Sequence, residues 1–175
     1  DFLFFINAIL PQDIAIHNIF PVKSDVHARY SAVSRTYQYT VSQVRNPFSL
    51  ELSWYYPVPV DVIVMNEAAK KLLCFTDFTS FSKLHSDVKN NLCQLYEARW
   101  TLNGGELVFT IRGNRFLRNM VRSIVGTMID LGRGKLKMED FIRIVESRNR
   151  NMAGFSAPAR GLALVQVEYP VDIRL

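Results

Sequence analysis

The 175-residue sequence has few of the residues that build metal centres or disulfide frameworks. It contains two cysteines and three histidines, and no pair among them has the spacing of zinc ligands. Cys74 and Cys93 are far apart in the sequence. The simplest interpretation is therefore a reduced, cytoplasmic protein with no metal site.

Long apolar runs and the common catalytic loops are also missing. The longest apolar run, residues 2–10, is too short to span a bilayer and has no basic residues before it, so neither membrane insertion nor a signal peptide is expected. The sequence contains no Gly-x-Ser-x-Gly, which argues against a hydrolase triad. Because the chain opens at Asp1 without a methionine, we expect that further residues precede it.

The sequence is rich in apolar residues and carries a net positive charge. It is 49% hydrophobic and 12% aromatic, which is enough for a core in one compact domain or two small ones. Lys and Arg number 21 against 16 Asp and Glu, for a net charge of +5. This excess favours an anionic partner, above all nucleic acid, although many basic proteins bind nothing acidic.

Hydrophobic periodicity predicts strands interrupted by two helical blocks. Asp61 is a candidate helix cap, and Asn103-Gly104-Gly105 is a candidate hairpin turn. The pattern predicts an α+β fold, with a mainly antiparallel sheet and helices packed on one face. The expected helices are 2–10, 61–73, 115–131 and 138–147, and the expected strands are 13–22, 34–44, 93–102, 106–113 and 161–170.

Three arginines stand at the start of the third predicted helix. Arg115, Arg118 and Arg122 would lie roughly on one helix face, where cations in the first turn oppose the helix dipole. A solvated face is the ordinary alternative for the first two. Arg122 shares its side of the helix with Val125 and Ile129, which predicts partial burial. A buried guanidinium needs a carboxylate or phosphate partner.

Arginines and tyrosines are also dense in HARYSAVSRTYQY, residues 27–39. The two-residue period of a strand places Arg35, Tyr37 and Tyr39 on one face. Such a face can stack a flipped base. The alternative is that the tyrosine rings pack in the core with their hydroxyls hydrogen-bonded.

Four segments occur in a fixed order along the chain, and together they resemble the C-terminal half of the tRNA pseudouridine synthase A family. The resemblance spans nearly the whole sequence. Its most specific parts are RTYQY and FLRNMVRSIVG, whereas DFTSF alone is weak. The segments are HARYSAVSRTYQY, DFTSF, FLRNMVRSIVG and GLALVQVEYP.

The resemblance implies roles for particular residues. Tyr37 would stack on the target uracil and take part in proton transfer. Arg122 would pair with a nucleophilic aspartate and hold it ionised. Leu162 or Leu164 would line the base pocket. The enzyme would break the bond between N1 of uracil and C1′ of ribose, turn the base and rejoin it through C5, with no metal or organic cofactor.

The same resemblance implies a substrate and an assembly. The substrate would be a uridine in the anticodon arm of tRNA, and the full-length enzyme would be a cytoplasmic homodimer with one RNA spanning both subunits. The RNA surface would include Arg29, Arg35, Arg115 and Arg118.

The sequence departs from the family at one motif. The family's nucleophile lies in Gly-Arg-Thr-Asp-Ala-Gly-Val-His, in its N-terminal half, and these 175 residues contain no such motif. Asp25 precedes Val-His-Ala but lacks the flanking Gly and Arg-Thr, so it is not expected to be catalytic. We therefore expect residues 1–175 to form a single C-terminal domain that is inactive alone.

Two other functions fit the same residues. One is a non-catalytic RNA-binding α+β domain, and the other is a protein–protein dimerisation module in which the aromatic residues form a subunit contact. A buried Arg122 that faces an open cleft beside Tyr37 would favour the enzyme. Absence of a cleft between these two residues would favour the alternatives.

Overall fold

The computed structural model describes residues 2–83 and 90–175, so part of the polar stretch predicted after DFTSF lies outside the described residues. The chain forms two compact units. One consists of Asp1–Ala32 with Tyr169–Leu175, and the other is Val33–Glu168. Each unit has its own internal contacts.

The first unit contains α1 (Phe2–Ile9), which confirms the helix predicted for residues 2–10. The two chain segments of this unit meet where the hydroxyl of Tyr169 donates to the carbonyl of Ala28 at 2.7 Å. A short 3₁₀ turn, η5 (Val171–Ile173), follows.

The strand predicted for residues 13–22 is wrong. Among the described residues, its pairing is limited to one isolated bridge between Val22 and Arg174. The backbone of Ile16 bonds instead to the side chain of Asn7, by two hydrogen bonds of 2.8 Å each. Alternating apolar residues favour a strand, but a strand also needs a neighbour along its length, and this segment has none.

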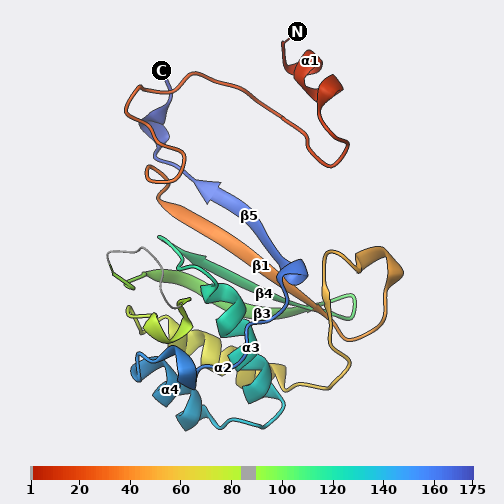
Figure 1. Ribbon diagram of the computed structural model, residues 1–175, viewed down its shortest axis with the longest axis vertical. Coiled ribbons are helices and arrows are strands. Elements are labelled where there is room, and N and C mark those ends of the chain that lie inside the picture. The colour runs from red at the N-terminus through yellow and green to blue at the C-terminus, as the bar shows by residue number, and fades with distance from the viewer. Residues whose placement is uncertain (1, 84–89) are drawn as a thin grey trace. The chain divides into compact units, whose positions relative to one another are not determined.

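The second unit is built on a five-stranded sheet. Strand β1 pairs with β4 on one side and with β5 on the other, and both pairs are antiparallel. The short β2 pairs in parallel with the end of β1. Figure 1 shows β5 at the open edge of this sheet. The strands are β1 (Ser34–Ser42), β2 (Trp54–Tyr55), β3 (Leu95–Asn103), β4 (Glu106–Gly113) and β5 (Leu162–Glu168).

Two helices, α2 (Val62–Leu72) and α3 (Met120–Gly132), cover one face of this sheet, and α4 (Met138–Glu146) packs against them on the same side (Figure 1). The core lies between the two layers. The rings of Trp100 and Phe109 stack there at 4.9 Å between centroids. These observations confirm the predicted α+β class, the mainly antiparallel sheet and the helices on one face. In the described parts of the chain, no helix combines the length and apolarity that a membrane span requires.

Local signals placed two elements correctly. Asp61 caps α2, because its carboxylate accepts from the amides of Ile63 at 2.9 Å and Val64 at 3.1 Å. The hairpin turns at Gly104 and Gly105, whose φ angles of 56° and 86° suit glycine.

The start of α3 differs from the prediction. The helix begins at Met120, so Arg115 and Arg118 precede it and do not share a helix face with Arg122. The physical reason is Asn119, whose φ of 69° is left-handed and interrupts a continuous helix. Arg122 alone of these arginines lies in the first turn.

Candidate active site

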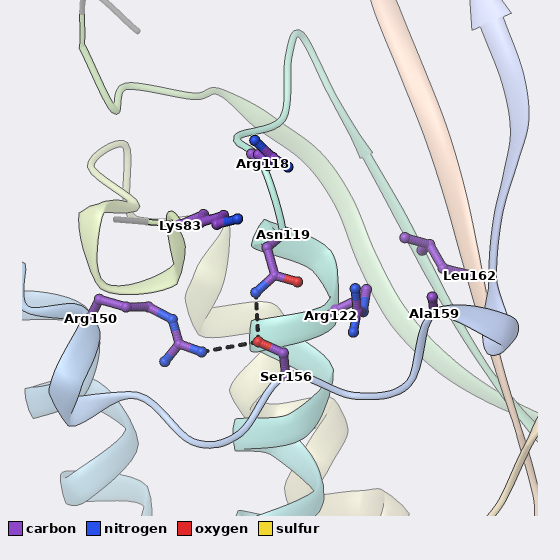
Figure 2. A pocket seen from close by; sticks show the side chains of 8 residues that line it. All are labelled: Lys83, Arg118, Asn119, Arg122, Arg150, Ser156, Ala159 and Leu162. Atoms are coloured by element: carbon purple, nitrogen blue, oxygen red, sulfur yellow. Dashed lines mark hydrogen bonds between the residues drawn. The ribbon is translucent and has the colours of Figure 1, made fainter. Parts of the chain in front are cut away.

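A cleft of ≈ 920 Å³ opens beside the start of α3 (Figure 2). Among the described residues that line it, four side chains are cationic and none carries a carboxylate. Such like charges repel one another unless an anion lies between them. The lining residues are Lys83, Arg118, Asn119, Arg122, Arg150, Ser156, Ala159 and Leu162.

Arg122 lines this cleft and is partly buried, as its place among apolar residues predicted. Its Nε donates to the carbonyl of Ala157 at 2.5 Å, and the amide of Ala157 donates back to the carbonyl of Arg122 at 3.0 Å. Among the ion pairs of the described residues, none includes Arg122. A neutral carbonyl therefore orients a guanidinium whose charge is not neutralised there.

Ala157 belongs to an irregular stretch, the 153–158 segment, which side chains hold in place. Arg150 donates to the carbonyls of Ala153 at 3.3 Å and Gly154 at 3.1 Å, and to Oγ of Ser156 at 3.0 Å. From the other side, Nδ2 of Asn119 donates to the same Oγ at 2.5 Å (Figure 2). Ser156 thus joins Arg150 to the start of α3.

The 153–158 segment also lies very close to the body of α3. A Cβ at Gly126 would lie 1.9 Å from the carbonyl oxygen of Phe155, so only glycine permits this approach. The amide of Gly154 donates to Oγ1 of Thr127 at 3.0 Å. These contacts fix the segment against the turn of α3 that follows Arg122.

Tyr39 anchors the same segment from the sheet. It is fully buried, and its hydroxyl donates to the carbonyl of Pro158 at 2.7 Å. Burial raises the pKa of this phenol, while the charges of Arg122 and Arg160 act in the opposite direction. For Tyr39, core packing with a bonded hydroxyl is therefore the correct interpretation.

Tyr37 is partly buried and packs against the core. Its ring meets the ring of Phe116 edge-on, with 5.1 Å between centroids. Tyr37 pairs with Leu164 across β1 and β5, and Tyr39 pairs with Leu162, a lining residue of the cleft. Tyr37 is thus the diagonal neighbour of Leu162. It is not among the described residues that line the cleft, so a shared site for Tyr37 and Arg122 stays a prediction.

The remaining predicted site residues lie outside the cleft lining. Arg35 donates to the carbonyl of Asn114 at 2.7 Å, and Arg115 donates to Oδ1 of Asn90 at 3.2 Å. Leu164 is half exposed on β5. Arg29 lies in the first unit, and its guanidinium is 5.6 Å from the centre of the Tyr30 ring.

Of the predicted residues, the structure brings Arg118, Arg122 and Leu162 to one cleft. Sequence reasoning missed four polar residues that line it. Asn119 and Lys83 could have been found, since one lies within FLRNMVRSIVG and the other directly follows DFTSFS. Nothing local distinguishes the other two. The missed residues are Lys83, Asn119, Arg150 and Ser156.

Comparisons with known proteins identify the family of the chain. A family model described as tRNA pseudouridine synthase matches residues 68–170. The protein named tRNA pseudouridine synthase A from Bacteroides fragilis is 50% identical over 169 residues, covering 96% of this chain and 67% of the relative. Its counterpart from Parabacteroides distasonis is 49% identical, with the same coverage of each chain. The counterpart from Anoxybacillus flavithermus is 40% identical over 94% of this chain and 67% of its own length.

The chain spans about two thirds of the length of these curated relatives. It belongs to the tRNA pseudouridine synthase family, which confirms the resemblance drawn from the sequence.

Proposed function

We propose that this chain acts in the isomerisation of uridine to pseudouridine in tRNA and supplies the arginine and tyrosine side of the active site. The observation that carries the proposal is the setting of Arg122. This residue is partly buried in the first turn of a helix, at a cleft whose described lining carries four cations and no carboxylate. The membership of the chain in the tRNA pseudouridine synthase family supports the same reaction.

Arg122 is suited to receive the nucleophilic carboxylate. Its charge in the first turn opposes the helix dipole, so an approaching carboxylate would relieve an unfavourable interaction. The planar guanidinium keeps its charge and offers several donors in a fixed geometry. With Nε occupied by Ala157, its remaining donors can grip one carboxylate and keep it ionised.

Tyr37 and the start of β5 would form the base pocket. Leu162 lines the cleft, and Tyr37 lies diagonally across the strands from it. An aromatic ring and an apolar side chain can hold the uracil after its bond to ribose breaks. Leu164, the direct neighbour of Tyr37 across the strands, would extend this surface.

The tRNA backbone would lie along the exposed cations of the cleft, Lys83 and Arg118. The two residues come from distant parts of the sequence, but the amide of Lys83 donates to the carbonyl of Arg118 at 3.0 Å. This bond brings two flexible cations to the same edge, as phosphate binding requires. Arg29, Arg35 and Arg115 would add to the RNA surface elsewhere.

The wider assignments rest on the family resemblance. We propose that residues 1–175 are the C-terminal domain, and that the complete protein carries the nucleophile in the Gly-Arg-Thr-Asp motif missing here. The substrate would be a uridine of the anticodon arm. The complete protein would act as a homodimer in the cytoplasm.

The test is release of tritium from tRNA labelled at C5 of uridine, because the isomerisation replaces the hydrogen at that carbon. The complete protein should release tritium, and the purified 175-residue chain should not. Turnover by the chain alone that Asp25→Asn abolishes would overturn the missing-nucleophile assignment.

The cationic cleft also fits a non-catalytic RNA-binding domain. Salt-sensitive tRNA binding by the complete protein with no tritium release would favour that alternative.

A further inference from the structure

Arg150 lies across the cleft from Arg122 (Figure 2). It comes from a short 3₁₀ turn, η3 (Arg150–Met152), that follows α4. Its hydrogen bonds within the described residues go to three oxygens of the 153–158 segment: the carbonyls of Ala153 and Gly154, and Oγ of Ser156. All three acceptors are neutral. Arg150 therefore binds neutral groups of the chain itself, which distinguishes it from Lys83 and Arg118, the exposed cations of the cleft.

We propose that Arg150 is a positioning residue for the reaction. It fixes the 153–158 segment so that the carbonyl of Ala157 holds the Arg122 guanidinium in the orientation that receives the nucleophilic carboxylate. This inference rests on the proposed function, because it assigns Arg150 a role through Arg122.

The 153–158 segment needs such support because it has little regular structure. Residues 154–158 belong to neither a helix nor a strand, so their backbone groups depend on side chains for partners. Arg150 and Tyr39 bond to carbonyls on opposite sides of Ala157. The carbonyl that orients Arg122 thus lies between two anchored points.

Ser156 couples this support to the helix itself. Its Oγ accepts from Arg150 at 3.0 Å and from Asn119 at 2.5 Å, and it lies 3.2 Å from Oγ of Ser123. Asn119 and Ser123 flank Arg122 at the start of α3. Moving Arg150 would therefore disturb the surroundings of Arg122 along two routes, through Ser156 and through Ala157.

A lysine cannot replace this arginine. The guanidinium reaches three oxygens from one rigid plane, whereas an ammonium is a single point of charge on a flexible stem. If Arg150 only contributed charge to RNA binding, Arg150→Lys would act like the wild type. If it positions the segment, Arg150→Lys should resemble Arg150→Gln.

The experiment uses the complete protein with Arg150→Lys, Arg150→Gln and, as a control with the same loss of charge, Arg133→Gln. Arg133 is exposed just after α3 and does not line the cleft. Single-turnover tritium release gives the rate, and tRNA binding at several salt concentrations gives the affinity and its salt slope. Thermal unfolding monitors the fold.

Both Arg150 variants should lose at least about tenfold in single-turnover rate, because small misplacements of reacting groups are costly. Their tRNA affinity and salt slope should stay within about twofold of the wild type. A weaker, less salt-dependent affinity with an unchanged rate would show a phosphate contact and overturn the proposal. So would a rate for Arg150→Lys equal to that of the wild type.

Ser156→Ala keeps the test decisive if both Arg150 variants fail to fold. It removes the hydroxyl shared by Arg150 and Asn119 and leaves the bonds of Arg150 to the two carbonyls in place. A reduced rate at unchanged affinity supports the positioning role, and an unchanged rate refutes it. Absence of turnover in the wild-type protein would instead count against the proposed function.

Discussion

The N-terminal ends of α2 and α3 carry side chains of opposite charge. Asp61 caps α2 with a carboxylate bonded to two backbone amides, in agreement with the helix dipole. At α3, Asn119 has left-handed backbone angles and its side chain does not cap the helix, and a cation, Arg122, occupies the first turn. The first arrangement stabilises a helix on its own, whereas the second does not.

The difference separates a structural helix start from a functional one. Bonds that would cap α3 are replaced by bonds to a distant part of the chain, since Asn119 donates to Ser156 and Arg122 donates to Ala157. The start of α3 therefore depends on tertiary contacts, and it leaves positive charge facing a cleft. We expect changes at α2 to affect stability alone, and changes at α3 to affect activity as well.

The largest effect is expected for Arg122→Lys in the complete protein. Lysine keeps the charge but cannot hold a carboxylate and the Ala157 carbonyl in one plane, so single-turnover tritium release should fall by about 100-fold or more. The melting temperature should change little. Arg133→Lys is the matched control and should act like the wild type. An unchanged rate for the Arg122→Lys enzyme would contradict a functional role for the start of α3.

Gly126→Ala should come next. The added methyl group would meet the Phe155 carbonyl at 1.9 Å, so the 153–158 segment must move away from α3. We expect a loss of about 1–3 kcal/mol in the free energy of unfolding, measured with urea. Activity should fall as well, because Ala157 moves with the segment. As the control on α2, Glu67→Ala at an exposed position should be nearly neutral.

The cations before α3 should affect tRNA binding more than those at the end of α2. Lys83→Ala and Arg118→Ala should each weaken binding and lower the salt slope by about one. Lys70 and Lys71, in the last turn of α2, suit the helix dipole and are exposed. Lys70→Ala and Lys71→Ala each remove one positive charge, as Lys83→Ala and Arg118→Ala do. Equal losses of affinity for both pairs would mean that net charge, rather than the cleft, binds the RNA.

The smallest effects test the two helix starts directly. Asp61→Ala should cost about 1 kcal/mol of stability, the usual value of an N-cap, and leave tritium release unchanged. Asn119→Ala should cost a similar amount, about 1–2 kcal/mol, because alanine tolerates left-handed angles poorly. Unlike Asp61→Ala, it should also lower the rate, since its bond to Ser156 is lost. Identical behaviour of the two variants would contradict the comparison.

Elements defined by local chemistry were predictable from the sequence. The Asp61 cap, the glycines of the hairpin turn and the alternation along β1 each depend on neighbouring residues. The partial burial of Arg122 followed from the apolar residues around it. Hydrophobic periodicity predicted the α+β class, and the segments that resemble the family predicted the family itself.

Only the tertiary structure decided which residues form the cleft. The strand predicted for residues 13–22 failed because its alternation has no neighbouring strand among the described residues. Helix α3 begins late because Asn119 adopts a left-handed backbone conformation, and its side chain bonds to a segment far along the chain. Lys83 and Arg150 reach the same cleft from opposite sides of α3 in the sequence. Sequence patterns predict interactions between residues that are close together in the chain. They do not report which distant carbonyl will orient a guanidinium, because packing of the whole chain sets that distance.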